Sequence, residues 1–147
     1  MSSPDAKDVA DRLHSAAIHL LRRVRKVDEE TGLTAARLSA LSVVVFGGPV
    51  TLGQLATAEQ VSPPTMTRLV SAMEADGLVR RAADAQDRRV AWIAATARGK
   101  RLLQEGRDRR IALLSEALRG LSASELKTLD DAADLLTGIT SSLGQRT

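Results

Sequence analysis

The side chains with the clearest chemical purpose are hydroxyl and guanidinium groups between Ser62 and Arg89. Both groups donate hydrogen bonds to phosphate oxygens and to the edges of bases, so they can bind and read DNA. In a helix that starts at Ser62, the spacing places Pro64, Arg68, Ser71 and Ala75 opposite the apolar side, with Thr65 and Thr67 flanking it. We therefore predict a DNA-contacting surface formed by Ser62, Pro64, Thr65, Thr67, Arg68, Arg81, Asp87, Arg88 and Arg89.

Arg88 and Arg89 end a polar loop, where they can reach phosphates or a minor groove, and Asp87 beside them can orient a guanidinium. The alternative is a solvated hairpin end whose charges keep a strand edge from aggregating. Residues 61–101 contain eight Lys/Arg and four Asp/Glu, a net charge of +4, whereas the rest of the chain contains thirteen and fourteen, a net charge of −1. The positive charge is concentrated where a phosphate backbone would lie, which favours DNA binding.

The sequence lacks the patterns that would indicate catalysis or metal binding. His14 and His19 are the only histidines, they are five residues apart, and there is no cysteine to complete a zinc site. No glycine-rich phosphate loop and no cluster of catalytic carboxylates is present. We therefore expect no enzyme activity, no cofactor and no metal.

Two helices must position the predicted surface. Residues 52–60 form a short apolar helix, and Ser62 is a suitable N-cap for a second helix that begins at the two prolines after it. Gly77 is expected to end this helix in the left-handed conformation. The apolar face of the second helix is predicted to consist of Met66, Leu69, Val70 and Met73.

A small sheet is predicted behind the two helices. Residues 78–81 and 90–93 are short strand-like runs that flank the polar loop 84–89. Val50 and Thr51 are expected to add a third strand to this sheet. Before it, a helix capped by Thr34 is predicted to turn Leu38, Leu41 and Val45 inward, and the Gly-Gly-Pro run at 47–49 ends it. The whole is a helix-turn-helix followed by a charged β-ribbon.

The first predicted helix covers about residues 4–30 and has a wide apolar stripe. We expect this stripe to be buried both against its own domain and against a partner subunit. The cluster Arg22–Lys26 is basic and is followed by Asp28-Glu29-Glu30. It can be an anchor for a ligand carboxylate, a second phosphate contact, or a solvated face with local ion pairs, which stabilise little.

The C-terminal third is predicted to be two helices that serve dimerisation. A long helix runs to about Arg119, and Gly106 within it marks a hinge, a close crossing or a tolerated glycine. Residues 122–125 are a capping box, and the last helix repeats apolar residues in heptad steps. The predicted dimer contacts are Leu13, Leu20, Leu126, Leu129, Leu136 and Leu143.

Length and composition indicate one domain of 147 residues whose core is built from Leu, Val and Ala, because Phe46 and Trp92 are the only aromatic residues. There is no cysteine, and no uninterrupted apolar run approaches the length that spans a membrane. The N-terminal residues do not have the pattern of a signal peptide. We expect a cytoplasmic protein without membrane contact, associated with the nucleoid when it is bound to DNA.

An ordered series of motifs resembles the multiple-antibiotic-resistance regulator (MarR) family across nearly the whole chain. These motifs are Leu33-Thr34, Leu52-Gly53-Gln54-Leu55-Ala56, Val61-Ser62, Thr67-Arg68-Leu69-Val70, Gly77-Leu78-Val79-Arg80, Asp87-Arg88-Arg89 and Thr96-Ala97-Arg98-Gly99. Ala95 departs from the family, which more often has leucine there, and should thin the packing under the β-ribbon, called the wing in this family.

The resemblance implies a mainly α-helical fold with a small β-wing, in which residues 33–96 form a winged helix-turn-helix lobe and residues 4–30 and 97–143 are dimerisation helices. It implies a homodimeric regulator that binds a pseudo-palindromic operator in double-stranded DNA, usually a repressor released by a small-molecule effector. That effector would bind between the dimer helices and the DNA-binding lobe. The alternative is a winged-helix module that binds protein, for which cations at Arg68, Arg88 and Arg89 would not be needed.

Overall fold

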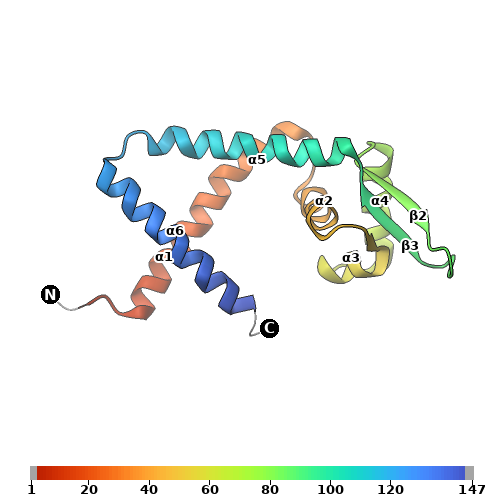
Figure 1. Ribbon diagram of the computed structural model, residues 1–147, viewed down its shortest axis with the longest axis horizontal. Coiled ribbons are helices and arrows are strands. Elements are labelled where there is room, and N and C mark those ends of the chain that lie inside the picture. Colours follow the sequence, from red (N-terminus) through yellow and green to blue (C-terminus); the bar gives the residue numbers. More distant parts are fainter. Residues whose placement is uncertain (1–2, 145–147) are drawn as a thin grey trace. The chain divides into compact units, whose positions relative to one another are not determined.

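The computed structural model describes residues 3–144, which form six α-helices, one 3-10 helix and a three-stranded sheet (Figure 1). The chain divides after Arg110, within a helix, into two compact units. The first unit contains α1 (Ala6–Arg25), η1 (Lys26–Thr31), α2 (Ala35–Gly47), α3 (Leu52–Ala58), α4 (Pro63–Ala75), the sheet and the start of α5 (Ala97–Leu118). The second contains the rest of α5 and α6 (Ala123–Gly144). The predicted fold class, mainly helical with a small β-wing, is confirmed.

The helix-turn-helix is formed by α3 and α4, and local capping fixes both starts. Thr51 and Gln54 make a reciprocal capping box at the start of α3. Ser62 Oγ accepts a hydrogen bond of 3.4 Å from the backbone N–H of Thr65, so the predicted N-cap of α4 is confirmed. Gly77 has φ of +73°, a conformation that glycine adopts without strain, and the predicted end of α4 is confirmed.

The wing sheet has the strand order β1-β3-β2, with both pairings antiparallel. Its strands are β1 (Val50–Thr51), β2 (Val79–Ala83) and β3 (Ala91–Ala95). The predicted third strand is therefore confirmed. Both long strands begin one residue later and end two residues later than the sequence predicts, so each is one residue longer. The pairing of Ala83 with Ala91 thus extends the sheet to the edge of the polar loop.

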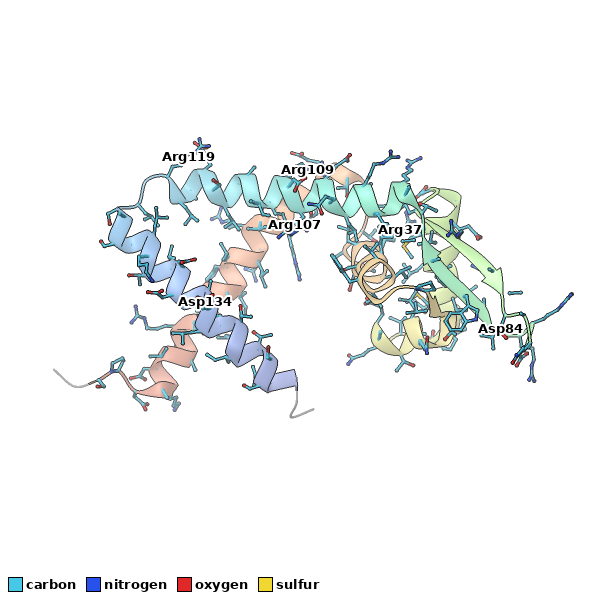
Figure 2. All side chains as sticks on the ribbon, viewed as in Figure 1. Arg37, Asp84, Arg107, Arg109, Arg119 and Asp134 are labelled. Atoms are coloured by element: carbon cyan, nitrogen blue, oxygen red, sulfur yellow. The ribbon has the colours of Figure 1, made fainter. Side chains whose placement is uncertain are left out.

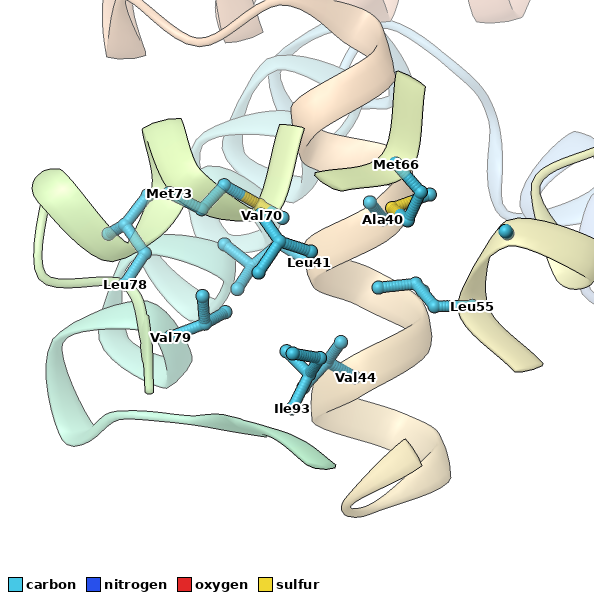
Figure 3. Packing of buried hydrophobic residues seen from close by; sticks show 11 residues of the cluster. Ala40, Leu41, Val44, Leu55, Met66, Val70, Met73, Leu78, Val79 and Ile93 are labelled. Carbon is cyan, nitrogen blue, oxygen red and sulfur yellow. The ribbon is translucent and has the colours of Figure 1, made fainter. Parts of the chain in front are cut away.

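The hydrophobic core lies in the first unit, between α2, α3, α4 and the sheet (Figure 3). Its largest fully buried side chains are Leu41, Val44, Leu55, Met66, Val70, Met73, Leu78, Val79 and Ile93. The prediction for α2 was wrong in part, because the buried face consists of Ala40, Leu41 and Val44. Val45 is half-buried and packs against this core, whereas Leu38 is half-buried and is not part of it.

The first helix is shorter than predicted. Its α-helical part ends at Arg25, and residues 26–31 form the 3-10 helix η1, a common way for a helix to tighten at its C-terminal end. Thr31 Oγ1 donates a hydrogen bond of 2.6 Å to the carbonyl oxygen of Asp28 within this turn. Gly32, with φ of +73°, then ends the segment.

The start of α5 is joined to the end of the helix-turn-helix. The backbone N–H of Thr96 donates to the carbonyl oxygen of Leu78 at 3.0 Å, and Thr96 Oγ1 donates to that of Gly77 at 2.6 Å. One turn into α5, a Cβ on Gly99 would lie 2.2 Å from the carbonyl oxygen of Leu78. No side chain fits in that space, so glycine is required for this close approach.

In the second unit, the predicted capping box of α6 is confirmed. The backbone N–H of Ser122 donates to Glu125 Oε2 at 2.8 Å, and the N–H of Glu125 donates to Ser122 Oγ at 3.3 Å. The hydrogen bonds from the Ser122 backbone and side chain lower the pKa of the Glu125 carboxyl below its usual value. No helix of residues 3–144 combines the length and the apolar character needed to cross a membrane.

Candidate nucleic-acid interface

The outward side of α4 is polar and exposed. Ser62, Pro64, Thr65 and Arg68 are all exposed, and the hydroxyls of Ser62 and Thr65 lie 2.9 Å apart. Thr67 is half-buried, and its hydroxyl donates a hydrogen bond of 3.0 Å to the carbonyl oxygen of Pro63. The side chains of Ser62, Pro64, Thr65 and Arg68 are therefore available to contact a partner. The Thr67 hydroxyl already donates its hydrogen bond to a backbone carbonyl within the helix.

The loop between β2 and β3, which we call the wing tip (residues 84–90), is held together by Asp84 (Figure 2). Its Oδ1 accepts a hydrogen bond of 2.8 Å from Trp92 Nε1 on β3. Its Oδ2 accepts from the backbone N–H groups of Gln86 and Asp87, both at 3.0 Å. The Trp92 hydrogen bond first, and then the two backbone N–H groups, lower the pKa of Asp84 below its usual value. One carboxylate thus fixes the loop to the strand that follows it.

Asp87 binds one edge of the Arg89 guanidinium with both of its carboxylate oxygens. Its Oδ1 accepts from Arg89 Nε and its Oδ2 from Arg89 Nη2, both at 3.0 Å. This pair lowers the pKa of Asp87 and raises that of Arg89. Arg88, by contrast, is exposed and forms no ion pair with any residue from 3 to 144. The wing tip therefore presents one oriented guanidinium and one free one.

Arg81 has a different environment from the other predicted cations. It lies in β2, and its Nη2 donates a hydrogen bond of 3.2 Å to Ser71 Oγ on α4. The predicted surface thus consists of Arg81 and two groups, one on α4 and one at the wing tip. Within the described residues, no hydrogen bond or ion pair joins the predicted members of these two groups directly.

The comparisons with known proteins agree with this architecture. The model of the MarR family matches residues 31–90, which include the helix-turn-helix and the wing tip. The HTH-type transcriptional regulator MT0903.1 of Mycobacterium tuberculosis is 33% identical over 139 residues, which cover 95% of this chain and 96% of that protein. The chain belongs to the MarR family.

Solved structures of other proteins have the same winged-helix fold as this MarR-family chain. The transcriptional regulator Tm0710 from Thermotoga maritima superposes with a TM-score of 0.80, at 26% identity, and covers 92% of this chain and 95% of its own. A mutant of MepR from S. aureus, solved with a bound oligodeoxyribonucleotide, superposes with a TM-score of 0.69 at 22% identity, over 95% of this chain and 99% of its own.

Three residues that shape the candidate interface were not among the predicted DNA contacts: Ser71, which the sequence placed only on the outward side of α4, and Asp84 and Trp92. Asp84 could have been found, because an aspartate that begins a polar turn commonly accepts hydrogen bonds from backbone N–H groups two or three residues later. Its bond to Trp92 depends on the strand register, in which Trp92 lies opposite Ala82. The pairing of Ser71 with Arg81 depends on how α4 packs against β2, and no local signal indicates it.

A cavity of about 820 Å³ lies in the first unit, beside α2. Its apolar lining includes Leu21, Val24, Leu33, Leu38, Val45 and Leu103. Its charged lining consists of Arg25, Lys100, Arg107 and Arg110 with Asp28 and Glu29. Leu38 and Val45, which the sequence predicts to point inward, both line this cavity, and Val45 also packs against the core.

Two of the charged residues that line the cavity form an ion pair. Arg110 Nη1 donates to Asp28 Oδ1 at 2.5 Å. A Cβ on Gly106 would lie 3.3 Å from that nitrogen, which belongs to a flexible side chain of the same helix, and 3.6 Å from that oxygen, an ordinary van der Waals contact. The contact with η1 at Gly106 therefore does not require glycine. The basic cluster Arg22–Lys26 makes no local ion pair with a described residue, and Asp28, which follows it in the sequence, pairs with Arg110 instead.

Proposed function

We propose that this chain is a homodimeric transcriptional repressor that binds a pseudo-palindromic operator in double-stranded DNA and is released by a small ligand. Its DNA-binding character is supported by family membership. It rests above all on one observation, the exposed polar side of α4 accompanied by an ordered wing that carries Arg88 and Arg89. The MepR mutant with its bound oligodeoxyribonucleotide is consistent with this function.

In this proposal α4 is the recognition helix and lies in a major groove. A groove about 12 Å wide admits a helix, and small side chains let its backbone come close to the bases. Ser62, Pro64, Thr65 and Arg68 are the contacts that the exposed surface favours. Thr67 contributes less than the sequence predicts, because its hydroxyl donates to Pro63. Arg88 and Arg89 contact the adjacent minor groove or its phosphates, with Asp87 holding the Arg89 guanidinium in position.

Dimerisation is supported by the apolar residues of α6. None of its residues is buried in the single chain. The predicted contacts Leu126, Leu129, Leu136 and Leu143 are exposed by 37% to 59%, and Leu13 and Leu20 of α1 are exposed as well. Leucines in heptad steps that remain this exposed favour cover by a second copy. A symmetric dimer also presents two recognition helices to two half-sites about 34 Å apart.

Ligand release is supported by the cavity beside α2. Its volume, about 820 Å³, is sufficient for a drug-sized molecule. Its apolar lining and its excess of four cations over two carboxylates favour a small apolar molecule with an anionic group. Such a ligand changes DNA affinity only if it binds the free and the DNA-bound conformations with different affinity.

The test of DNA binding is fluorescence anisotropy with a duplex from upstream of the chain's own gene, against a scrambled duplex, over a series of salt concentrations. We expect tighter binding to the upstream duplex, two chains per site, and a steep salt dependence. Replacing Arg88 and Arg89 with alanine should weaken binding and reduce the salt slope by about one for each phosphate that the variant no longer neutralises.

The matched control removes two cations elsewhere, at Arg119 and Lys127, which pair with Glu116 and Asp131 in the second unit. This control variant should bind DNA nearly as the wild type does. Equal reductions in affinity for both double variants would contradict a role for the wing. Binding that is weak and equal on both duplexes, with genome-wide fragment selection also negative, would favour the winged-helix module that binds protein.

A further inference from the structure

Arg81 lies on the face of β2 that includes the buried Val79. Side chains alternate between the two faces of a strand, so Arg81 shares this face with Val79, which is 2% exposed. Its partner in the strand register is Ile93, which is fully buried. Arg80, the neighbouring arginine, belongs to the opposite face. The Arg81 side chain therefore leaves the sheet beside the recognition helix, and that of Arg80 leaves it on the other side.

The guanidinium of Arg81 contacts α4 through Ser71. The hydrogen bond from Nη2 to Ser71 Oγ is 3.2 Å long, and among residues 3–144 it is the only side-chain hydrogen bond between α4 and the sheet. Arg81 forms no ion pair with a described residue. The hydrogen bond to Ser71 is therefore the polar link between the recognition helix and the wing.

We propose that Arg81 is a positioning residue that holds the wing against the recognition helix through Ser71, and not a direct contact to phosphate as its residue type predicts. The proposal rests on the proposed DNA binding. A protein that must place a helix in one groove and a wing in the next binds more tightly when the two are fixed in advance, because less freedom is lost on binding. The planar guanidinium suits this role better than an ammonium group, since its donors have fixed directions.

The test breaks the hydrogen bond from either side without removing the charge of Arg81. Ser71→Ala removes the acceptor, and Arg81→Lys keeps the cation but not the fixed donor geometry. Each should weaken affinity for the upstream duplex about two- to tenfold, the range for one hydrogen bond, with the salt slope unchanged. Ser71→Thr keeps a hydroxyl and should retain the wild-type affinity. Arg80→Lys, on the opposite face of the same strand, is the matched control and should have no effect.

A double-mutant cycle separates coupling from two independent contacts to DNA. If Arg81 acts through Ser71, the Ser71→Ala/Arg81→Lys variant should bind no more weakly than either single variant. Additive reductions in affinity would overturn the proposal, because they would mean that the two residues contact DNA separately. A second pair of results would also overturn the proposal: Ser71→Ala binds DNA with wild-type affinity, and Arg81→Gln has a lower salt slope. Together these results would identify Arg81 as a direct phosphate contact.

The link can also be measured without DNA. The same cycle in thermal unfolding should show coupling between Ser71 and Arg81, and no coupling between Ser71 and Arg80. Absence of coupling between Ser71 and Arg81 would overturn the link itself, whatever the DNA measurements gave. A wild type that binds neither the upstream duplex nor selected genomic fragments would instead refute the proposed function, so the two failures are distinguishable.

Discussion

Asp84 accepts three hydrogen bonds, although it lies outside the surface predicted to contact DNA. By binding Trp92 Nε1 with one oxygen and two backbone N–H groups with the other, it orders the loop that carries Arg88 and Arg89. At the scale of single residues, residue type alone does not predict which contacts a side chain makes. The arginines at 81, 88 and 89 are alike in the sequence, yet the first contacts a serine, the second is exposed without an ion pair to a described residue, and the third is held by a carboxylate.

Acidification should loosen the wing tip. The pKa of Asp84 is lowered from 3.8 in the folded chain, so its contribution to stability is fully present above 3.8 and is lost as the pH falls through the lower, folded value. Asp87, whose pKa is also lowered from 3.8, adds to the same effect. Trp92 is the only tryptophan, so its emission reports on this loop and should shift below pH 3.8.

Asp84→Asn should already show the altered emission at neutral pH. Asparagine can still accept from Trp92, but its amide nitrogen cannot accept from the backbone N–H groups of Gln86 and Asp87. Asp134→Asn, an exposed change on α6, is the control and should leave the emission unchanged. An Asp84→Asn spectrum identical to that of the wild type across the pH range would show that Asp84 does not order the wing tip.

At the scale of elements, features set by neighbouring residues could be predicted and features set by packing could not. The caps at Thr34, Ser62 and Ser122 were identified because an N-cap depends on a few adjacent residues. The inward face of α2 was predicted at Leu38, Leu41 and Val45, but its buried residues are Ala40, Leu41 and Val44. The buried face of a helix depends on which side the other elements cover, and the helix's own sequence does not fix that. Likewise, the change from α1 to η1 at Lys26 has no strong sequence signal, since residues 26–31 contain neither glycine nor proline.

Gly99→Ala is predicted to destabilise the first unit. The added Cβ would lie 2.2 Å from the carbonyl oxygen of Leu78 and 3.2 Å from Leu41 Cδ1, so the backbone must move. Overpacking of this kind costs about 1–3 kcal/mol, measured as a lower free energy of unfolding in urea. Gly53→Ala is the control, because nothing lies within 4 Å of its Cβ, and it should be neutral or slightly stabilising. Equal stability for Gly99→Ala and the wild type would contradict the close approach.

At the scale of the whole molecule, the exposed leucines of α6 are the feature that a single chain does not explain. Their heptad spacing is visible in the sequence, and the structure adds that none is buried in one chain. The cavity, in contrast to the leucines of α6, could not be predicted from the sequence. It is bordered by residues from α1, η1, α2 and α5, and no sequence pattern would have brought Val24, Leu38 and Leu103 together.

Leu136→Glu should convert the proposed dimer to a monomer. A carboxylate placed within an apolar interface must be desolvated without a partner, which is strongly unfavourable. Sedimentation equilibrium should then give a mass near the 15.7 kDa of one chain, in place of twice that value. Ser141→Glu, on another side of α6, is the control and should remain dimeric. A dimer that survives Leu136→Glu would exclude this face of α6 from the interface.

The tight approach at Gly99 also bears on how genetic data from this protein should be interpreted. A screen for alleles that no longer regulate their target would recover substitutions at Gly99 repeatedly, because every other residue carries a Cβ that meets the Leu78 carbonyl oxygen. Such alleles would look like those of a contact residue, although Gly99 is buried and does not line the cavity. Measuring the amount of folded protein in each strain would separate them from true interface alleles.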